Sequence, residues 1–429
     1  MKTSTNNVIT FVNKEYDRRR EIFLLEEAYD LLKEEVFPKK LVVDLEKFGR
    51  FNISDPFDIK TVSDNYTCSF ERSTENVAVI TAILASGKCQ ENTEIYFPRA
   101  NAASAEVAEL CQMLDQKKFS ERITLYVPLE LLFEHIHSFA KILNSDVEPK
   151  NLTLNFGVNA FCLDELLDSI TKPLPDGCVL ALDATVGSSD GFGMQWIADA
   201  FQAKKFRAHI SLNLSGNDYH EERDWLPLIQ NINHEKCPNH FSLDLSDCAL
   251  YCFPKTLDKI VQNFSNRNYP RFFDLNLGGA VEENTVIALF EAIGEGKALE
   301  GLSLGLRSNN IGDQGILTLS KALQTGSCPK NMKIDLGNNC FTQLGFLSLL
   351  EGISHPNAPD GLTLDLNDNY LDEKSVLALV SALKKGVPLG LKITMKSKNY
   401  LKKTHNKVQY LLCSALAYMP PRKFELELY

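Results

Sequence analysis

A repeat of constant length runs through the second half of the chain and limits its possible folds more than any other feature. Three segments place an apolar residue at every second position and an Asn three residues after the last of them: 302–309, 332–339 and 362–369. Their central apolar residues are Leu304, Ile334 and Leu364, so the period is 30 residues. A fixed period of about 20 to 50 residues is typical of a solenoid, in which each unit buries its apolar face only against its neighbours.

Each repeat reads as a strand followed by a helix. Alternation of apolar and polar residues over five positions predicts a short strand with one buried face. The Asn after the strand can satisfy backbone groups in the turn, and stacked repeats would align these amides in a ladder, with Cys248 at the same position in one repeat. Apolar pairs four residues apart follow and share one helical face: Leu289/Ile293, Leu319/Leu323, Leu349/Ile353 and Leu379/Leu383. The fold class predicted is therefore an α/β solenoid (horseshoe) with a parallel β-sheet on the concave face and α-helices on the convex face.

The repeat extends over most of the chain. The expected central strand residues are Val43, Cys68, Ile95, Leu125, Leu154, Leu182, Leu212, Leu243, Leu275, Leu304, Ile334, Leu364, Ile393 and Leu426. We expect residues 39–429 to form a solenoid of about 13 to 14 repeats. Residues 1–38 differ, with a short strand expected at 8–11 and a helix at 13–36, and we interpret them as an N-terminal helical cap that covers the open end. The alternative is a partner-binding helix.

Charge and composition exclude several function classes. The net charge of −11 and the pI of about 5.4 argue against nucleic-acid binding and against an anionic membrane surface. The apolar runs are short, and residues 1–20 lack the apolar segment of a cleaved signal peptide. The 11 cysteines show neither disulfide-framework nor zinc spacing. We therefore expect a cytosolic-type protein with reduced cysteines, no cofactor and no metal; His135 and His137, two residues apart, make a poor metal pair.

The polar side of the strands offers the candidate binding residues. The residue after each strand centre should point into the concavity, and in this column four positions are acidic: Asp183, Asp244, Asp335 and Asp365. They could present a negative stripe to a basic partner, or they could be an ordinary solvated face. The same column begins with Tyr96 and Tyr126 on adjacent strands, and exposed paired tyrosines are typical of binding hot spots. The alternative is that the N-terminal segment folds over them.

The segment from Leu304 to Leu323, with Asn309, Ile311-Gly312-Asp313 and Gly315 between them, resembles the ribonuclease-inhibitor-type leucine-rich repeat. That resemblance implies a binding protein rather than an enzyme. In overall style the chain also resembles the leucine-rich repeat effectors that intracellular bacterial pathogens export through a specialised secretion system. This second resemblance implies virulence-related action on a host protein in the host cytosol.

We therefore expect a non-catalytic, monomeric scaffold that binds a protein partner through its concave face. One alternative is a regulator of a small GTPase, although the acidic tail of that family is missing and no catalytic Arg can be matched. Another is an inhibitor of a basic enzyme such as a nuclease. A ubiquitin-ligase effector is disfavoured because the repeats continue to Tyr429. Residues 127–132 faintly resemble the start of an F-box, but the repeat pattern accounts for the same residues.

Overall fold

The computed structural model describes residues 123–144, 152–158, 160–172, 179–184, 192–206, 209–217, 221–369 and 373–395. It also describes residue 112 and four further strands, Val8–Phe11, Lys40–Asp44, Thr93–Tyr96 and Phe424–Leu428. The chain divides into two compact units, Met1–Leu212 and Asn213–Tyr429, and each is considered by itself.

The first unit is a parallel sheet whose strands follow the order of the sequence. Its strands are β1 (Val8–Phe11), β2 (Lys40–Asp44), β3 (Thr93–Tyr96), β4 (Ile123–Val127), β5 (Leu152–Gly157) and β6 (Val179–Asp183). Each strand pairs in parallel with the next. Its described helices are α4 (Leu129–Leu143), α5 (Ala160–Ser169) and α6 (Phe192–Gln202). Strand β7 (His209–Asn213) ends at the division between the units.

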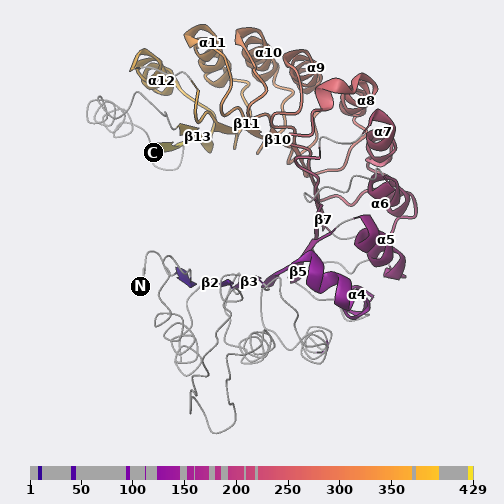
Figure 1. Ribbon diagram of the computed structural model, residues 1–429. Helices are drawn as coiled ribbons and strands as arrows, with labels where there is room; N and C mark the ends of the chain where they lie inside the picture. The colour runs from indigo at the N-terminus through magenta and orange to yellow at the C-terminus, as the bar shows by residue number, and fades with distance from the viewer. Residues whose placement is uncertain are drawn as a thin grey trace. The chain divides into compact units, whose positions relative to one another are not determined.

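The second unit repeats the same arrangement. Its strands are β8 (Phe241–Asp244), β9 (Phe273–Asn276), β10 (Ser303–Gly305), β11 (Lys333–Asp335), β12 (Thr363–Asp365), β13 (Leu391–Met395) and β14 (Phe424–Leu428). Its helices are α7 (Glu222–Asn231), α8 (Pro254–Ser265), α9 (Glu283–Gly294), α10 (Asp313–Gln324), α11 (Gln343–Ile353) and α12 (Glu373–Lys385), with the 3₁₀ helix η1 (Leu250–Cys252) before α8. Helices α9 to α12 lie along one side of strands β10 to β13 (Figure 1).

Strand pairing in the second unit confirms the predicted period. Ser303 pairs with Lys333, and Lys333 pairs with Thr363, so equivalent residues are 30 positions apart on neighbouring strands. The central residues Leu304 and Leu364 are buried, and the residues on either side of them are partly exposed. An α/β solenoid with parallel strands is therefore what the alternating pattern produces, because only one face of each strand packs against helices.

The predicted ladder of amides is present and links successive repeats. The Nδ2 of Asn339 donates to the carbonyl oxygens of Leu306 and Leu336, both over 3.0 Å. Its Oδ1 accepts from the backbone N–H of Asn309 at 3.0 Å and of Ile311 at 3.1 Å. One buried amide thus satisfies four backbone groups from two repeats, which explains the choice of Asn at this position.

The N-terminal segment contributes a strand to the first unit. Strand β1 pairs in parallel with β2, and β2 pairs directly with β3. The helix expected at 13–36 and the strand expected around Cys68 lie outside the described residues. Within the parts of the chain that the structure describes, no helix is both long enough and apolar enough to cross a lipid bilayer.

Candidate binding surface on the strand face

The strand face is the side of each sheet opposite its helices. In the second unit one column of this face runs through directly paired residues, one from each of six strands: Asp244, Asn276, Gly305, Asp335, Asp365 and Thr394. All six are partly exposed. The sequence pattern placed these residues in register correctly.

A backbone turn explains why four of these six positions hold Asp or Asn, and the same turn occurs at Asn213. In each case the side-chain Oδ1 accepts a hydrogen bond from the N–H two residues later, where the chain leaves the strand. The pairs are Asn213 with Ser215, Asp244 with Ser246, Asn276 with Gly278, Asp335 with Gly337, and Asp365 with Asn367. This is the Asx turn. It needs a side-chain oxygen as acceptor, which the charged carboxylate of Asp and the neutral amide of Asn both supply. The turn hydrogen bond therefore accounts for Asp or Asn at these positions. It does not require the negative charge that Asp adds.

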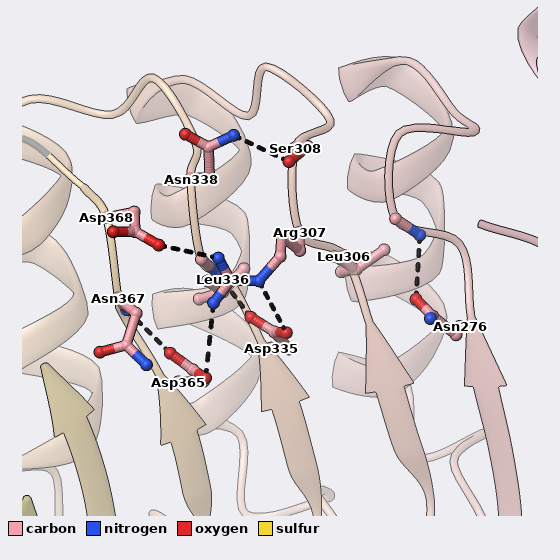
Figure 2. A network of polar contacts seen from close by, with 12 residues as sticks. Asn276, Leu306, Arg307, Ser308, Asp335, Leu336, Asn338, Asp365, Asn367 and Asp368 are labelled. Atoms are coloured by element: carbon pink, nitrogen blue, oxygen red, sulfur yellow. Dashed lines mark hydrogen bonds and ion pairs between the residues drawn. The ribbon is translucent and has the colours of Figure 1, made fainter. Parts of the chain in front are cut away.

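Arg307 crosses the column and binds three carboxylates (Figure 2). Its Nε lies 3.3 Å from Oδ2 of Asp335, its Nη2 lies 3.6 Å from Oδ2 of Asp365, and its Nη1 donates to Oδ2 of Asp368 at 3.0 Å. Gly337 makes room for the guanidinium, because a Cβ at this position would lie 2.3 Å from Nη2 of Arg307. This cluster could not be predicted from the repeat, since Arg307 departs from the pattern.

The cluster changes the acid–base properties of its members. Desolvation acts to lower the pKa of Arg307, but the charges and hydrogen bonds of Asp335, Asp368 and Asp365 outweigh it and raise that pKa above its ordinary value. Burial raises the pKa of Asp365, and the neighbouring charge of Asp335 adds to this effect, against the hydrogen bond from Asn367 and the attraction of Arg307. With Arg307 charged and all three carboxylates ionised, the cluster has a net charge of −2.

The predicted negative stripe is therefore uneven within the second unit. Asp244 is separated from Asp335 by two positions without charge, Asn276 and Gly305. Its Oδ2 accepts a hydrogen bond from Nδ2 of Asn276 at 3.0 Å. The acidic character is concentrated at Asp335, Asp365 and Asp368, where Arg307 offsets one of three charges.

In the first unit the two tyrosines are direct neighbours, but Asp183 is not where the sequence placed it. Tyr96 pairs with Tyr126, whose side chain is partly exposed. The position of the Tyr96 side chain lies outside the described part of the structure. Asp183 pairs with Gly157, whereas the sequence pattern had aligned it with Asn155.

The physical reason for this shift lies in strand β5. Its burial pattern alternates over six residues, with Leu152, Leu154 and Phe156 all buried. A shift of two residues keeps the same side chains on the same face, whereas a shift of one would exchange the faces. The apolar pattern alone therefore allows two registers here, and the observed one pairs Leu182 with Phe156.

Groups that could support metal or thiol chemistry are few in the described residues. No cluster of three or more His, Cys, Asp or Glu side chains suitable for a metal ion occurs among them. His135 is buried, while Nε2 of the exposed His137 lies 3.6 Å from Glu165. Burial raises the pKa of the Cys162, Cys237 and Cys248 thiols to about 12, so these thiols stay protonated at neutral pH. Cys252 and Cys340 are exposed.

In comparisons with known proteins, no protein-family model and no curated protein matches the chain.

Proposed function

We propose that this protein is a non-catalytic scaffold that binds another protein through the strand face of its repeats. The observation that carries this proposal is the cluster of Arg307 with Asp335, Asp365 and Asp368, a charged and partly exposed group built across successive repeats. On this proposal the repeats are of the ribonuclease-inhibitor type, and the protein acts as a bacterial effector on a host protein. The resemblance of the segment from Leu304 to Leu323 supports the first part, and the overall style of the sequence supports the second.

Rigidity of the surface favours this role. The Asx turns hold the carboxylates of Asp335 and Asp365 against the backbone, and Arg307 links them across neighbouring strands. A preorganised surface loses little conformational entropy on binding, so more of the contact energy appears as affinity. Strand-face side chains held in this way suit recognition of a folded partner.

The net charge of the cluster indicates the chemistry of the partner. A charge of −2 in the cluster, on a chain with a net charge of −11, attracts a basic surface. Exposed single ion pairs contribute only about 0 to 1 kcal/mol each, so the charge acts mainly on association rate and on partner choice. Tyr126 and its strand neighbour Tyr96 are the candidate apolar contacts in the first unit.

The test is a comparison of matched variants in affinity capture from eukaryotic lysate, with mass spectrometry. Asp335→Asn with Asp365→Asn removes two charges and keeps the oxygens that the Asx turns need. Asp258→Asn with Glu291→Gln removes two charges from exposed positions on helices α8 and α9. We expect the strand-face variant to lose the captured protein and the helix-side variant to retain it. Equal capture by both variants would contradict a role for the cluster.

An inhibitor of a basic enzyme is the second candidate function, and the same cluster favours it. Such an enzyme, for example a nuclease, presents the positive surface that the acidic residues would attract. Arg307 gives no comparable support to regulation of a GTPase, because its guanidinium is bound to three carboxylates. Assays of nuclease activity and of GTP hydrolysis with the recovered partner distinguish an inhibitor, a GTPase regulator and a scaffold.

A further inference from the structure

We propose that the second unit contains a joint between strands β8 and β9, where two neighbouring repeats separate more readily than the repeats from β10 to β12. The first observation is an interruption of the amide ladder. The described part of this unit has equivalent ladder positions in successive repeats, all of them buried: Asn217, Cys248, Ala280, Asn309, Asn339 and Asn369. Two consecutive positions therefore hold residues without an amide.

Ala280 leaves the boundary between β8 and β9 without a ladder link. At the equivalent position, Asn339 accepts from the N–H of Asn309 in the preceding repeat over 3.0 Å. The methyl group of Ala280 cannot accept from the N–H of Cys248, which is the equivalent group in its own preceding repeat. Cys248 retains a weak donor, but its Sγ lies 3.0 Å from the carbonyl oxygen of Leu214, on the β7 side of β8. The ladder hydrogen bonds are therefore missing between β8 and β9.

Packing is also incomplete at the same boundary. A cavity of about 20 Å³ lies there, and the buried side chains that line it include Leu243 of β8, Leu275 of β9, and Ile260 and Phe264 of α8. Side chains around such a space lose the dispersion contacts that a filled core supplies. The contact between these two repeats is therefore weakened in its packing as well as in its hydrogen bonds.

The backbone beside the interrupted ladder is strained. Ala249 directly follows Cys248 and has a φ of 48°, in the left-handed region. Asn310 holds the equivalent position two repeats later, with a φ of 53°. Asn tolerates this region better than Ala, because its short polar side chain can form local hydrogen bonds there. Separation of the ends of β8 and β9 would release the strain at Ala249.

Aromatic contacts join the same two repeats at the start of the strands. The rings of Phe241 and Phe273 stack with their centroids 5.6 Å apart, and those of His240 and Phe272 stack with their centroids 4.5 Å apart. The interrupted ladder lies after the strands, at their opposite ends. The joint therefore pivots at the start of β8 and β9 and opens at their ends.

Opening of the joint would move Asp244 on β8 relative to the Arg307 cluster on β10 to β12. The bond from Nδ2 of Asn276 to Oδ2 of Asp244 crosses the joint over 3.0 Å, but it lies on the partly exposed strand face, where water can replace it. The strand face can thus adjust its width to a partner while the cluster moves as one group. The motion is a property of the free protein and does not depend on the proposed binding.

Hydrogen exchange of the full chain, resolved by residue with NMR, tests the joint directly. The N–H of Leu245 donates to the carbonyl oxygen of Asn276 across the joint, and the N–H of Leu336 donates to that of Asp365 between β11 and β12. Both bonds are 2.8 Å long, so the closed state protects the two amides alike. We expect the protection factor of Leu245 to be at least about tenfold lower than that of Leu336, because the joint opens more often. Equal protection of the two amides overturns the proposal.

Repair of the ladder tests its part in the joint. Ala280→Asn places an amide at the interrupted position. We expect it to raise the protection factor of Leu245 at least about tenfold relative to that of Leu336, which serves as the internal control. A folded Ala280→Asn variant in which the ratio of the two protection factors is unchanged overturns the proposal.

The converse substitution keeps the proposal testable if Ala280→Asn does not fold. Asn339→Ala creates the same interruption between β10 and β11, a boundary that the N–H of Leu306 crosses in a hydrogen bond of 2.8 Å. In this variant we expect the protection factor of Leu306 to fall at least about tenfold below that of Leu336. Equal protection of these two amides in Asn339→Ala would show that the ladder does not hold the repeats together, and the proposal would be wrong.

Discussion

Arg307 and Asp368 are 61 residues apart in the sequence, and Nη1 of Arg307 donates to Oδ2 of Asp368 over 3.0 Å. The bond spans two whole repeats, because one Arg side chain reaches from the turn after β10 to the turn after β12. Asp335, on the strand between them, binds the same guanidinium. The contact therefore connects three successive repeats, whereas the Asn ladder connects each repeat only with its neighbour.

Arg307 offsets the repulsion among the carboxylates of Asp335, Asp365 and Asp368, so its replacement should lower the stability of the fold. We expect Arg307→Ala to lower the free energy of unfolding by about 1 kcal/mol, a modest value because the side chain is partly exposed. Gly337→Ala should give a similar loss, since its Cβ would displace the guanidinium. Urea unfolding checks both variants. The control is Arg271→Ala, at an exposed arginine, which should change stability by less than about 0.5 kcal/mol.

Removal of a strand centre should open a cavity in the middle of the stack. Leu364 is fully buried. We expect Leu364→Ala to reduce stability by about 2 to 5 kcal/mol, measured by chemical denaturation. Leu344→Ala, at a side chain that is 70% exposed, should be close to neutral. Equal effects of the two substitutions would contradict the assignment of inner and outer positions.

The amide ladder should be sensitive to a single substitution. Asn339→Ala leaves the N–H groups of Asn309 and Ile311 and the carbonyl of Leu306 without their partner in a buried site. Each unsatisfied buried group costs about 1 to 3 kcal/mol, so we expect a total loss of about 3 kcal/mol or more. Hydrogen exchange should show faster exchange at the amides of Asn309 and Ile311. Unchanged exchange at both amides would refute the role of Asn339.

Two carboxylates should give stability profiles of opposite sign against pH. Burial, with repulsion from Asp335, raises the pKa of Asp365, so ionised Asp365 destabilises the fold. Asp365→Asn should therefore equal or exceed the parent in stability at pH 7, and the difference should vanish below about pH 4, where the ordinary aspartate is protonated. A variant less stable than the parent at pH 7 would contradict this sign.

Asp313 is the opposite case. Desolvation opposes its ionisation, but hydrogen bonds from the Thr342 hydroxyl and N–H and from the Gly345 N–H lower its pKa. Its contribution to stability is therefore present above the ordinary aspartate pKa of about 3.9 and is lost as the pH falls. We expect Asp313→Asn to be less stable than the parent at pH 7, with a smaller difference between the two at pH 3. Thermal unfolding at the two pH values measures both profiles.

The regular part of the fold was predictable because it depends on periodic burial. The pattern around Leu304, Ile334 and Leu364 identified the strands, their register and the helices that cover them. The pattern could not decide between registers related by two residues, as at Leu154, because such a shift leaves the buried face unchanged.

The candidate site was predictable only in part. The repeat pattern predicted which residues of the second unit pair along the column. The sequence alone does not show whether an Asp there is needed for its charge or for its oxygen, which accepts the turn hydrogen bond. The contact of Arg307 with Asp368 was not predictable, because nothing in a 30-residue period indicates a side chain that reaches two repeats away. The sequence signals for this cluster are two glycines: Gly305 at the end of β10, which leaves space for Asn276, and Gly337 in the turn after β11, which leaves space for Arg307.

Because equivalent residues are 30 positions apart, the chain can lose one whole repeat without a change of strand register. Excision of residues 309–338 would join Ser308 to Asn339, and the ladder, the strand register and the helix positions would all find an equivalent residue at the new junction. Asp365 would take the place of Asp335, but Asn367 would take the place of Gly337, and its Cβ would occupy the space that the guanidinium of Arg307 now fills. Asp368 would then be one repeat away instead of two, so the three-carboxylate cluster would not form. Loss or gain of one repeat is therefore compatible with the scaffold. The main structural change would be the loss of the contacts that Arg307 makes with its three carboxylates.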